Sequence, residues 1–306
     1  MAKVKGNPTL IKIEKTIHSY LQTHSTVILI DASYFIFYRF HAILSWWKLR
    51  HTDTYDNVKL NPFENELFLS QFHKLCNKSL ENIHKQFRET KTDIYQLIIS
   101  KDCPRCNIWR TKLYDEYKGQ RISNSQIGPF FQYFYEHIIT QTNHIVIEHP
   151  HLEADDCIAL VVKYMCNSND IINHIKKIII IASDNDYMQL LDNNRSIVLY
   201  DLKYVNLGEK RRIGSNMFHL FCKIINGDKS DNITPIFKSA LNNTKLIELY
   251  GGNENENISL ILSENMNLQN KIKGEKEREL YHFNSTLIHF DFIPEQYKNE
   301  FIAQYQ

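Results

Sequence analysis

The segment Lys177-Ile-Ile-Ile-Ile-Ala-Ser-Asp-Asn-Asp186 places four consecutive isoleucines just before two carboxylates. Short continuous apolar runs are typical of strands buried on both faces, as in a parallel sheet. Three other aliphatic runs also lead into carboxylates, at residues 27–31, 95–102 and 145–156. Open parallel sheets carry their ligand sites beyond the carboxyl ends of the strands. We therefore expect acids from four strands to meet at one edge of one sheet.

Carboxylates gathered at one edge would repel one another unless cations lay among them. Ligand sets made only of oxygen favour magnesium or manganese. The polar loop Gly227-Asp-Lys-Ser-Asp-Asn232 could return further acids to the same place. The sequence thus predicts a divalent-metal site whose candidate acids are Asp31, Asp102, Glu153, Asp155, Asp156, Asp184, Asp186, Asp228 and Asp231.

The composition is that of an ordinary globular protein, with 306 residues, 43% hydrophobic and 23% charged. No apolar stretch reaches the ~18 residues of a membrane span, and no signal-peptide core follows the basic start. The six cysteines are too sparse for a disulfide framework, which fits a reducing compartment. We expect no membrane partner and an intracellular, non-secreted protein of the cytoplasm, nucleus or a viral replication site. Cys103 and Cys106 lack a second ligand pair, which favours two loop thiols over a zinc site.

The formal charge of +1 argues at first against a nucleic-acid partner. However, nine of the 35 acidic residues belong to the candidate metal site. Without them, 36 basic residues face 26 acidic ones, so that a metal-filled site would leave a basic surface. Such a surface is compatible with a polyanion such as DNA.

Strand and helix signals alternate between residues 25 and 205, which predicts an α/β fold. We expect a twisted, mainly parallel sheet with helices on both faces. Helices are expected at 66–89, 126–141, 153–167 and 185–191, and a fifth strand at 196–200. Residues 1–24 are expected to form an N-terminal extension, and residues 206–306 a helical C-terminal region.

Helix capping could explain some of the acids without any metal. Acids in the first turn of a helix are favoured by its dipole, and Glu153-Ala-Asp-Asp156 opens a predicted helix. Asp184 or Asp186 could likewise cap the helix that follows it. Three carboxylates within four positions exceed what capping requires, whereas the pair at 184 and 186 is equally compatible with either role.

A basic, aromatic segment follows Asp102 and runs from Asn107 to Arg121. Arg and Lys side chains position phosphates, and aromatic rings stack on bases. The alternative is a solvated amphipathic helix, which composition alone would favour. The candidate nucleic-acid contacts in this segment are Arg110, Lys112, Tyr114, Lys118 and Arg121.

The ordered motifs together resemble the 5′-nuclease superfamily, which includes flap endonucleases, the 5′-nuclease domain of bacterial DNA polymerase I and phage ribonuclease H-type 5′-exonucleases. The match runs from Asp31 and Arg39-Phe-His-Ala42 through Asp102, Glu153-Ala-Asp-Asp156 and Ser183-Asp-Asn-Asp186 to Gly227–Asn232. Tyr117-Lys-Gly-Gln-Arg121 matches the basic motif of the family. The resemblance implies a PIN-like 5′-nuclease core at 25–205, with an arch or clamp segment around 103–125.

The resemblance also implies roles for single residues. One divalent ion would be held by Asp31, Asp102, Glu153 and Asp155, and a second by Asp184, Asp186 and Asp231. Asp156 and Asp228 would be auxiliary acids. Lys118 and Arg121 would act in catalysis beside Asp155 and Asp184 by holding the scissile phosphate. Further nucleic-acid contacts would come from Arg39, Arg110, Lys112 and Tyr114.

One segment departs from the family pattern. After Asn232 the family has a glycine-rich helix–hairpin–helix that grips duplex DNA, whereas residues 233–240 contain no glycine. Backbone amides approach phosphate less closely without glycine. We therefore expect a degenerate helix–hairpin–helix element in the C-terminal region.

The implied function is a 5′-3′ exonuclease and structure-specific flap endonuclease that hydrolyses DNA phosphodiesters in replication or repair. Its cofactors would be two Mg²⁺ ions, with Mn²⁺ able to substitute. Its partners would be DNA with 5′ ends, flaps or nicks, or an RNA–DNA hybrid, bound by a monomer. Association with a polymerase or clamp follows only by analogy. The alternatives are an RNA-directed 5′ nuclease and a non-catalytic nucleic-acid-binding scaffold.

Overall fold

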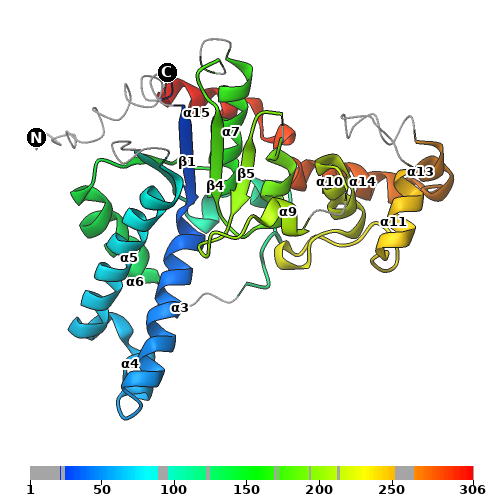
Figure 1. Cartoon of the computed structure of the whole chain (residues 1–306). Helices are drawn as coiled ribbons and strands as arrows, with labels where there is room; N and C mark the ends of the chain where they lie inside the picture. Colours follow the sequence, from blue (N-terminus) through cyan, green and yellow to red (C-terminus); the bar gives the residue numbers. More distant parts are fainter. Residues whose placement is uncertain are drawn as a thin grey trace, which may run out of the picture.

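The structure is a computed structural model of the chain, drawn in Figure 1. It describes residue 21 and residues 25–88, 96–121, 125–168, 171, 173–192, 194–211, 214–251 and 265–305. Except for Leu21, the expected N-terminal extension lies outside these residues, as do positions 122–124 of the expected arch segment.

A five-stranded sheet forms the centre of the molecule, in the order β3-β2-β1-β4-β5. All four pairings are parallel; between β1 and β4, Ile28 lies opposite Ile179. The strands are β1 (Thr26–Asp31), β2 (Leu97–Ser100), β3 (Ile145–Ile147), β4 (Lys177–Ile181) and β5 (Ile197–Tyr200). The predicted parallel sheet is therefore confirmed.

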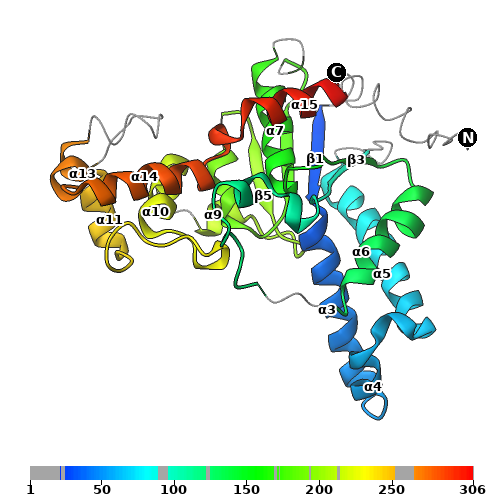
Figure 2. The same ribbon diagram turned by 180° about the vertical axis from the view of Figure 1, so that it is seen from behind.

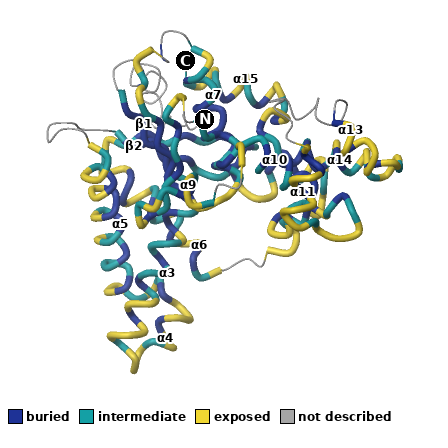
Figure 3. Tube along the Cα trace, turned by 45° about the vertical axis from the view of Figure 1, so that its right-hand side comes forward, coloured by how far each residue is buried: buried dark blue, intermediate teal, exposed yellow. Residues whose placement is uncertain are grey.

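Alternate strand residues point to opposite faces of the sheet and enter two separate cores. Val27 and Leu29 pack with the apolar side of α7 (Ala154–Asn167). Ile28 and Ile30 pack on the other face with aromatic side chains from neighbouring helices. Figure 3 shows the labelled strands β1 and β2 in the colour of buried residues. Burial on both faces explains why these strands are unbroken apolar runs.

A helical limb extends from the carboxyl end of β1 (Figures 1 and 2). Its long helices are α3 (Ala32–Arg50) and α5 (Glu66–Phe87), joined by α4 (Tyr55–Leu60) and a 3-10 turn at Pro62–Glu64. The single helix expected at 126–141 is divided into α6 (Gly128–Tyr133), a π-helical stretch at Phe134–Ile138 and a 3-10 turn at Ile139–Gln141.

Most of the C-terminal region forms a helical lobe, which lies to the right of the sheet in Figure 1, away from the limb at the lower left. A third core within it also takes in Cys103, Ile108 and Tyr117, so the basic segment packs against this lobe. Short helices follow β4 and β5: the 3-10 segment η6 (Asn185–Leu190) and α9 (Leu207–Arg211). The lobe itself contains α10 (Asn216–Asn226), η7 (Lys229–Asp231), α11 (Asn243–Tyr250), α13 (Met266–Lys271) and α14 (Glu275–Ile288).

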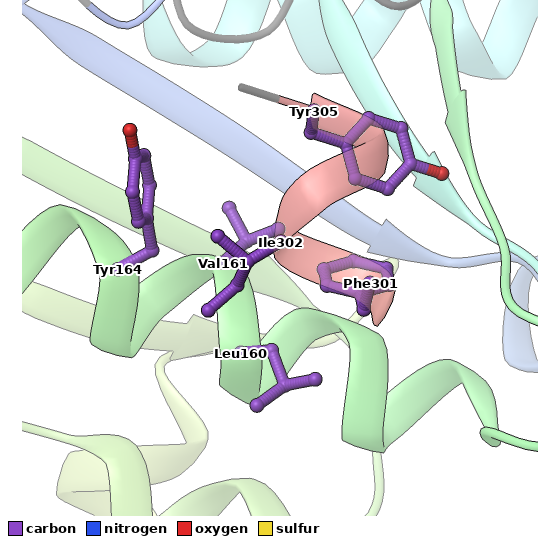
Figure 4. A pocket seen from close by; sticks show the side chains of 6 residues that line it. All are labelled: Leu160, Val161, Tyr164, Phe301, Ile302 and Tyr305. Atoms are coloured by element: carbon purple, nitrogen blue, oxygen red, sulfur yellow. The ribbon is translucent and has the colours of Figure 1, made fainter. Parts of the chain in front are cut away.

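The last helix, α15 (Glu295–Tyr305), returns to the α/β part after a 3-10 turn at Phe290–Phe292. Figure 4 shows Phe301 and Ile302 beside Leu160 and Val161 of α7, around a cavity of about 20 Å³. Because this helix covers α7, the chain end holds in place the helix that begins with Glu153-Ala-Asp-Asp156. Among the described residues, no helix is both long and apolar enough to span a membrane.

Candidate metal centre and nucleic-acid interface

Asp31 ends β1 and caps the N-terminus of α3, where its carboxylate accepts from the Tyr34 N–H at 2.9 Å. The buried Tyr187 hydroxyl also donates to it, at 3.0 Å. Burial, followed by repulsion from Asp102, raises the pKa of Asp31 to about 7. The β1 end therefore holds a carboxylate whose charge is costly unless a cation is near.

Asp102 lies two residues beyond β2 and faces the start of α7. Its carboxylate accepts from the Ser33 hydroxyl and, at 2.8 Å, from the Ala154 N–H. Burial raises the pKa of Asp102 in spite of these hydrogen bonds. Ala154 is the first residue of α7, the helix that follows β3. This hydrogen bond therefore brings Asp102, after β2, next to the acids at the start of α7.

The first acid cluster consists of Glu153, Asp155 and Asp156, which can each offer a ligand atom within 4.8 Å of the others. Glu153 and Asp156 form a capping box at the start of α7. Burial, then the neighbouring Asp156 and Glu153, raises the pKa of Asp155 well above its usual range. Capping therefore accounts for Glu153 and Asp156, whereas Asp155 lies in the first turn and accepts from the Asp156 N–H at 2.8 Å.

The second acid cluster consists of Asp186, Asp228 and Asp231, with ligand atoms again within 4.8 Å of one another. Asp228 stands in this group where Asp184 was expected; Asp184 is exposed and accepts from the Asp186 N–H at 3.0 Å. Burial raises the pKa of Asp186 to about 6. The loop 227–232 thus brings two carboxylates to the end of β4, as its motif predicted.

Lysine side chains lie against both clusters. Lys118 donates to Glu153, and Lys223 donates to Asp186 and, at 2.7 Å, to Asp228. Burial alone would raise the pKa of Glu153, but Lys118 and Arg110 hold it below its ordinary value. Both clusters are therefore partly neutralised by the protein itself.

Tyr117 connects the two clusters. Its buried hydroxyl lies 3.0 Å from Glu153 Oε2 and 3.1 Å from Asp231 Oδ2. The next residue, Lys118, has a left-handed backbone (φ 56°), and its N–H donates to the Asp231 carbonyl at 3.0 Å. Arg121 Nη2 donates to Asp231 Oδ1 at 2.6 Å. The basic motif Tyr117–Arg121 is thus held between the clusters, where Lys118 and Arg121 both lie beside carboxylates.

Comparison with protein families identifies this arrangement. Residues 26–218 match the family model of the 5′-3′ exonuclease N-terminal resolvase-like domain. The chain belongs to the 5′-3′ exonuclease family. Residues 214–306 match a second model, the C-terminal domain of T4 RNase H. The chain is therefore a nuclease, and the family that its sequence motifs resembled is confirmed.

Solved structures from bacteriophage T5 have the same fold as this exonuclease. T5 5′-exonuclease with bound zinc has a TM-score of 0.58 at 17% identity, covering 91% of this chain and 93% of that one. T5 D15 protein with metal ions has a TM-score of 0.58 at 14% identity, covering 90% and 96%. A pseudo-enzyme-product complex of T5 D15 flap endonuclease with DNA and metal ions has a TM-score of 0.58 at 16% identity, covering 90% and 96%. A comparison with curated proteins found no matching sequence.

Arg110 was expected to contact nucleic acid, and its position in the exonuclease contradicts this. The side chain is 2% exposed. Its guanidinium donates to Asp156 through Nη1 and Nη2, to Glu153 through Nη1, and to the Leu287 carbonyl through Nε. Every donor group faces the protein interior, because Arg110 neutralises the buried acids and ties them to α14.

Of the other expected nucleic-acid contacts, Lys118 and Arg121 lie beside the acid clusters, whereas Arg39, Lys112 and Tyr114 have other partners. Arg39 is half-buried on α3 and stacks over Tyr38, with 5.1 Å from its guanidinium carbon to the ring centroid. Lys112 donates to the Tyr297 hydroxyl at 2.7 Å, and Tyr114 donates to the Asn232 carbonyl at 3.0 Å. The contacts of Arg39, Lys112 and Tyr114 with a nucleic acid stay predictions.

Sequence reasoning missed four side chains that contact the proposed metal ligands. Tyr117 was noticed only as part of a motif, and Ser33 and Tyr187 were not singled out. Lys223 was not noticed at all. One signal could have found it: Lys223 lies in the last turn of α10, directly before the loop 227–232, and its long side chain is within reach of that loop.

Proposed function

We propose that this chain is a divalent-metal-dependent 5′-3′ exonuclease and structure-specific flap endonuclease that hydrolyses DNA. One observation carries the proposal: two oxygen-only acid clusters lie at the carboxyl ends of parallel strands, with a Tyr-Lys-x-x-Arg motif held between them. Membership of the 5′-3′ exonuclease family and the DNA complex of the T5 relative support it.

The donor set fits divalent cations such as Mg²⁺ or Mn²⁺, which prefer carboxylate oxygens. We propose two Mg²⁺ ions. Asp31, Asp102, Glu153 and Asp155 would hold one, and Asp184, Asp186 and Asp231 the other. Asp156 and Asp228 would be auxiliary acids, and Asp228 lies close enough to Asp186 and Asp231 to share the second ion. When bound, the ions would supply Lewis acidity to the phosphate and lower the pKa of water. The raised pKa values of Asp31 and Asp186 fit this proposal, because buried acids without cations resist ionisation.

The remaining side chains would position these acids and the phosphate. The Tyr187 hydroxyl orients Asp31, and the Ser33 hydroxyl orients Asp102. Lys118 and Arg121 would hold the phosphate oxygens, and their positive charge would stabilise the negative charge that develops there. Asp156 is held in the protein interior by Trp109, whose indole N–H donates to its carboxylate at 2.9 Å.

The test is product mapping on 5′-flap, nicked and single-stranded DNA labelled at either end. Asp155→Asn and Asp184→Asn should abolish cleavage at millimolar Mg²⁺ while the protein stays folded. Asp53→Asn, which makes the same change at an exposed position on the limb, is the matched control and should cleave normally. Full cleavage activity of Asp155→Asn would contradict the proposed metal centre.

Three finer points belong to the same proposal. The chain acts as a monomer inside a cell or at a viral replication site, and DNA is its principal substrate. Digestion of matched DNA, RNA and hybrid substrates separates this reading from an RNA-directed 5′ nuclease. Metal titration by calorimetry separates it from a non-catalytic scaffold, for which no divalent binding is expected.

A further inference from the structure

Lys223 is a basic residue set inside an acid cluster. It lies on α10, and its ammonium contacts both Asp186 and Asp228. The side chain is only 18% exposed, against 11% and 16% for the two acids. Its partners supply two of the three ligand atoms that lie within 4.8 Å of one another. The ammonium therefore uses oxygens that a divalent cation bound there would need.

The third acid of the cluster has a cation of its own. Asp231 accepts from Arg121, whose side chain is 47% exposed, and from the Tyr117 hydroxyl. Lys223 alone pairs Asp186 with Asp228 among the described contacts. These two acids come from η6 and from the loop after α10, so the lysine joins segments far apart in the chain. Without it, two half-buried carboxylates would face each other unpaired.

We propose that Lys223 is a displaceable internal cation of the second acid cluster: it holds Asp186 and Asp228 together until a divalent ion takes the same oxygens. This inference rests on the proposed function, because it assumes that the cluster binds such an ion. A divalent ion must displace the ammonium before it binds, and this raises the ion concentration that is needed to fill the site. Lys223 thereby sets the divalent concentration at which the second site fills.

Displacement is feasible because of how lysine is built. An ammonium and a divalent ion on the same oxygens would repel each other strongly in a partly buried site. A lysine has a flexible four-carbon stem, so its charge can move while the helix stays in place. Helix α10 is fixed by Phe221 and Ile224, which are fully buried in the third core. The ammonium can therefore turn toward solvent without any change in the fold.

The experiment is calorimetric titration of the metal-free full-length chain with Mg²⁺ and with Mn²⁺, in the absence of DNA. Lys223→Met removes the charge and keeps the stem, and should tighten the weaker binding step about tenfold, equivalent to about 1.4 kcal/mol. Lys223→Gln keeps a hydrogen-bond donor and should also tighten it, which guards against a folding defect in the first variant. Asp186→Asn should weaken the same step and so assigns it to this cluster.

Lys229→Met is the matched control, because Lys229 is exposed and directly follows Asp228. It makes the same change of charge close to the cluster without removing a contact. Metal affinity should change much less in this variant than in Lys223→Met. An equal rise in metal affinity in both variants would mean that any nearby loss of positive charge has this effect, and would overturn the inference.

Thermal unfolding gives a second readout. In EDTA, Lys223→Met should melt below the wild type, because it leaves carboxylates unpaired. Saturating Mg²⁺ should remove that difference, since an ion then joins the same acids. Unchanged or weaker metal binding in both Lys223 variants overturns the inference and spares the proposed function. Failure of the wild type to bind any divalent ion overturns both.

Discussion

Arg110 and Asp156 form a two-point ion pair in the interior, with Nη2–Oδ1 at 2.7 Å and Nη1–Oδ2 at 2.8 Å. Both side chains are almost completely buried. The pair joins the basic segment to the first turn of α7, next to the proposed metal ligand Glu153. A residue that a sequence motif suggests for phosphate binding thus keeps the acids in place.

Arg110→Met should destabilise the fold severely. Removing one partner of a buried ion pair leaves the other charge uncompensated, which typically costs about 3–5 kcal/mol. The free energy of unfolding should therefore fall by about that amount in urea denaturation, measured in EDTA. Arg278→Met, at an exposed position on α14, should change it by less than about 0.5 kcal/mol. Similar values for the two variants would mean that the buried pair is not important for stability.

Asp31 should make the metal-free protein less stable as pH rises. Burial and Asp102 raise its pKa from 3.8 to about 7 in the folded chain. Folding then favours the protonated carboxyl, so its contribution is full below pH 3.8 and is lost as pH rises through about 7. An amide mimics the protonated acid, and Asp31→Asn should therefore gain stability relative to the wild type over this range.

The measurement is the difference in melting temperature between Asp31→Asn and the wild type in EDTA, from about pH 5 to pH 8. A difference is needed because His144 and His289 are partly buried, which lowers their pKa values to about 4, so that their contribution to stability is lost in the opposite direction, as pH falls. The difference should grow with pH in EDTA, and reverse in sign at saturating Mg²⁺. A difference that stays constant across pH in EDTA would contradict the raised pKa.

Tyr187→Phe should weaken metal binding and cleavage without unfolding the protein. The hydroxyl donates to Asp31 at 3.0 Å, and partners that orient a metal ligand typically contribute about 10–100-fold in affinity or activity. Tyr38→Phe removes a hydroxyl from a partly exposed tyrosine on α3 and serves as the control. Metal titration and single-turnover cleavage of a flap substrate should both show the loss in Tyr187→Phe. Wild-type values in both assays would exclude an orienting role.

The sheet could be predicted because its strands are aliphatic runs rich in Ile, Val and Leu whose side chains enter the cores on both faces. The expected strand at 196–200 and helix at 153–167 differ by one residue from β5 and α7. The expected helix at 126–141 is interrupted because a π-helical stretch at 134–138 accommodates an extra residue within the turn. Local spacing does not report such a change of hydrogen-bond pattern.

The acids could be predicted because each follows an apolar run, whereas their cation partners could not. Arg110 meets Asp156 across 46 positions, and Lys223 meets Asp186 across 37. Spacing alone does not tell which basic residue turns inward and which stays in solvent. For the same reason, Asp228 could not be ranked above Asp184 as a member of the second cluster. The packing of the C-terminal lobe against the basic segment and of α10 against η6 decides these pairings.

Gly227→Ala should disrupt the second acid cluster through the backbone. Gly227 ends α10 with φ 66° and ψ −170°, a conformation that is essentially restricted to glycine. An added Cβ would lie 2.3 Å from the Ile233 carbonyl oxygen, which accepts from the Asp228 N–H at 3.0 Å. The substitution therefore forces apart the loop that carries Asp228 and Asp231.

The strain in Gly227→Ala should cost about 1–3 kcal/mol of unfolding free energy, and the displaced acids should weaken the second metal-binding step in calorimetry. Gly128→Ala is the control, because a Cβ there meets nothing within 4 Å and the residue lies in the first turn of α6. It should leave metal binding unchanged and stabilise the fold by up to about 1 kcal/mol. Since Gly227 contacts no proposed ligand through a side chain, weakened metal binding in its variant would report the loop geometry alone. A Gly227→Ala protein that binds both ions normally would show that this turn does not position the second cluster.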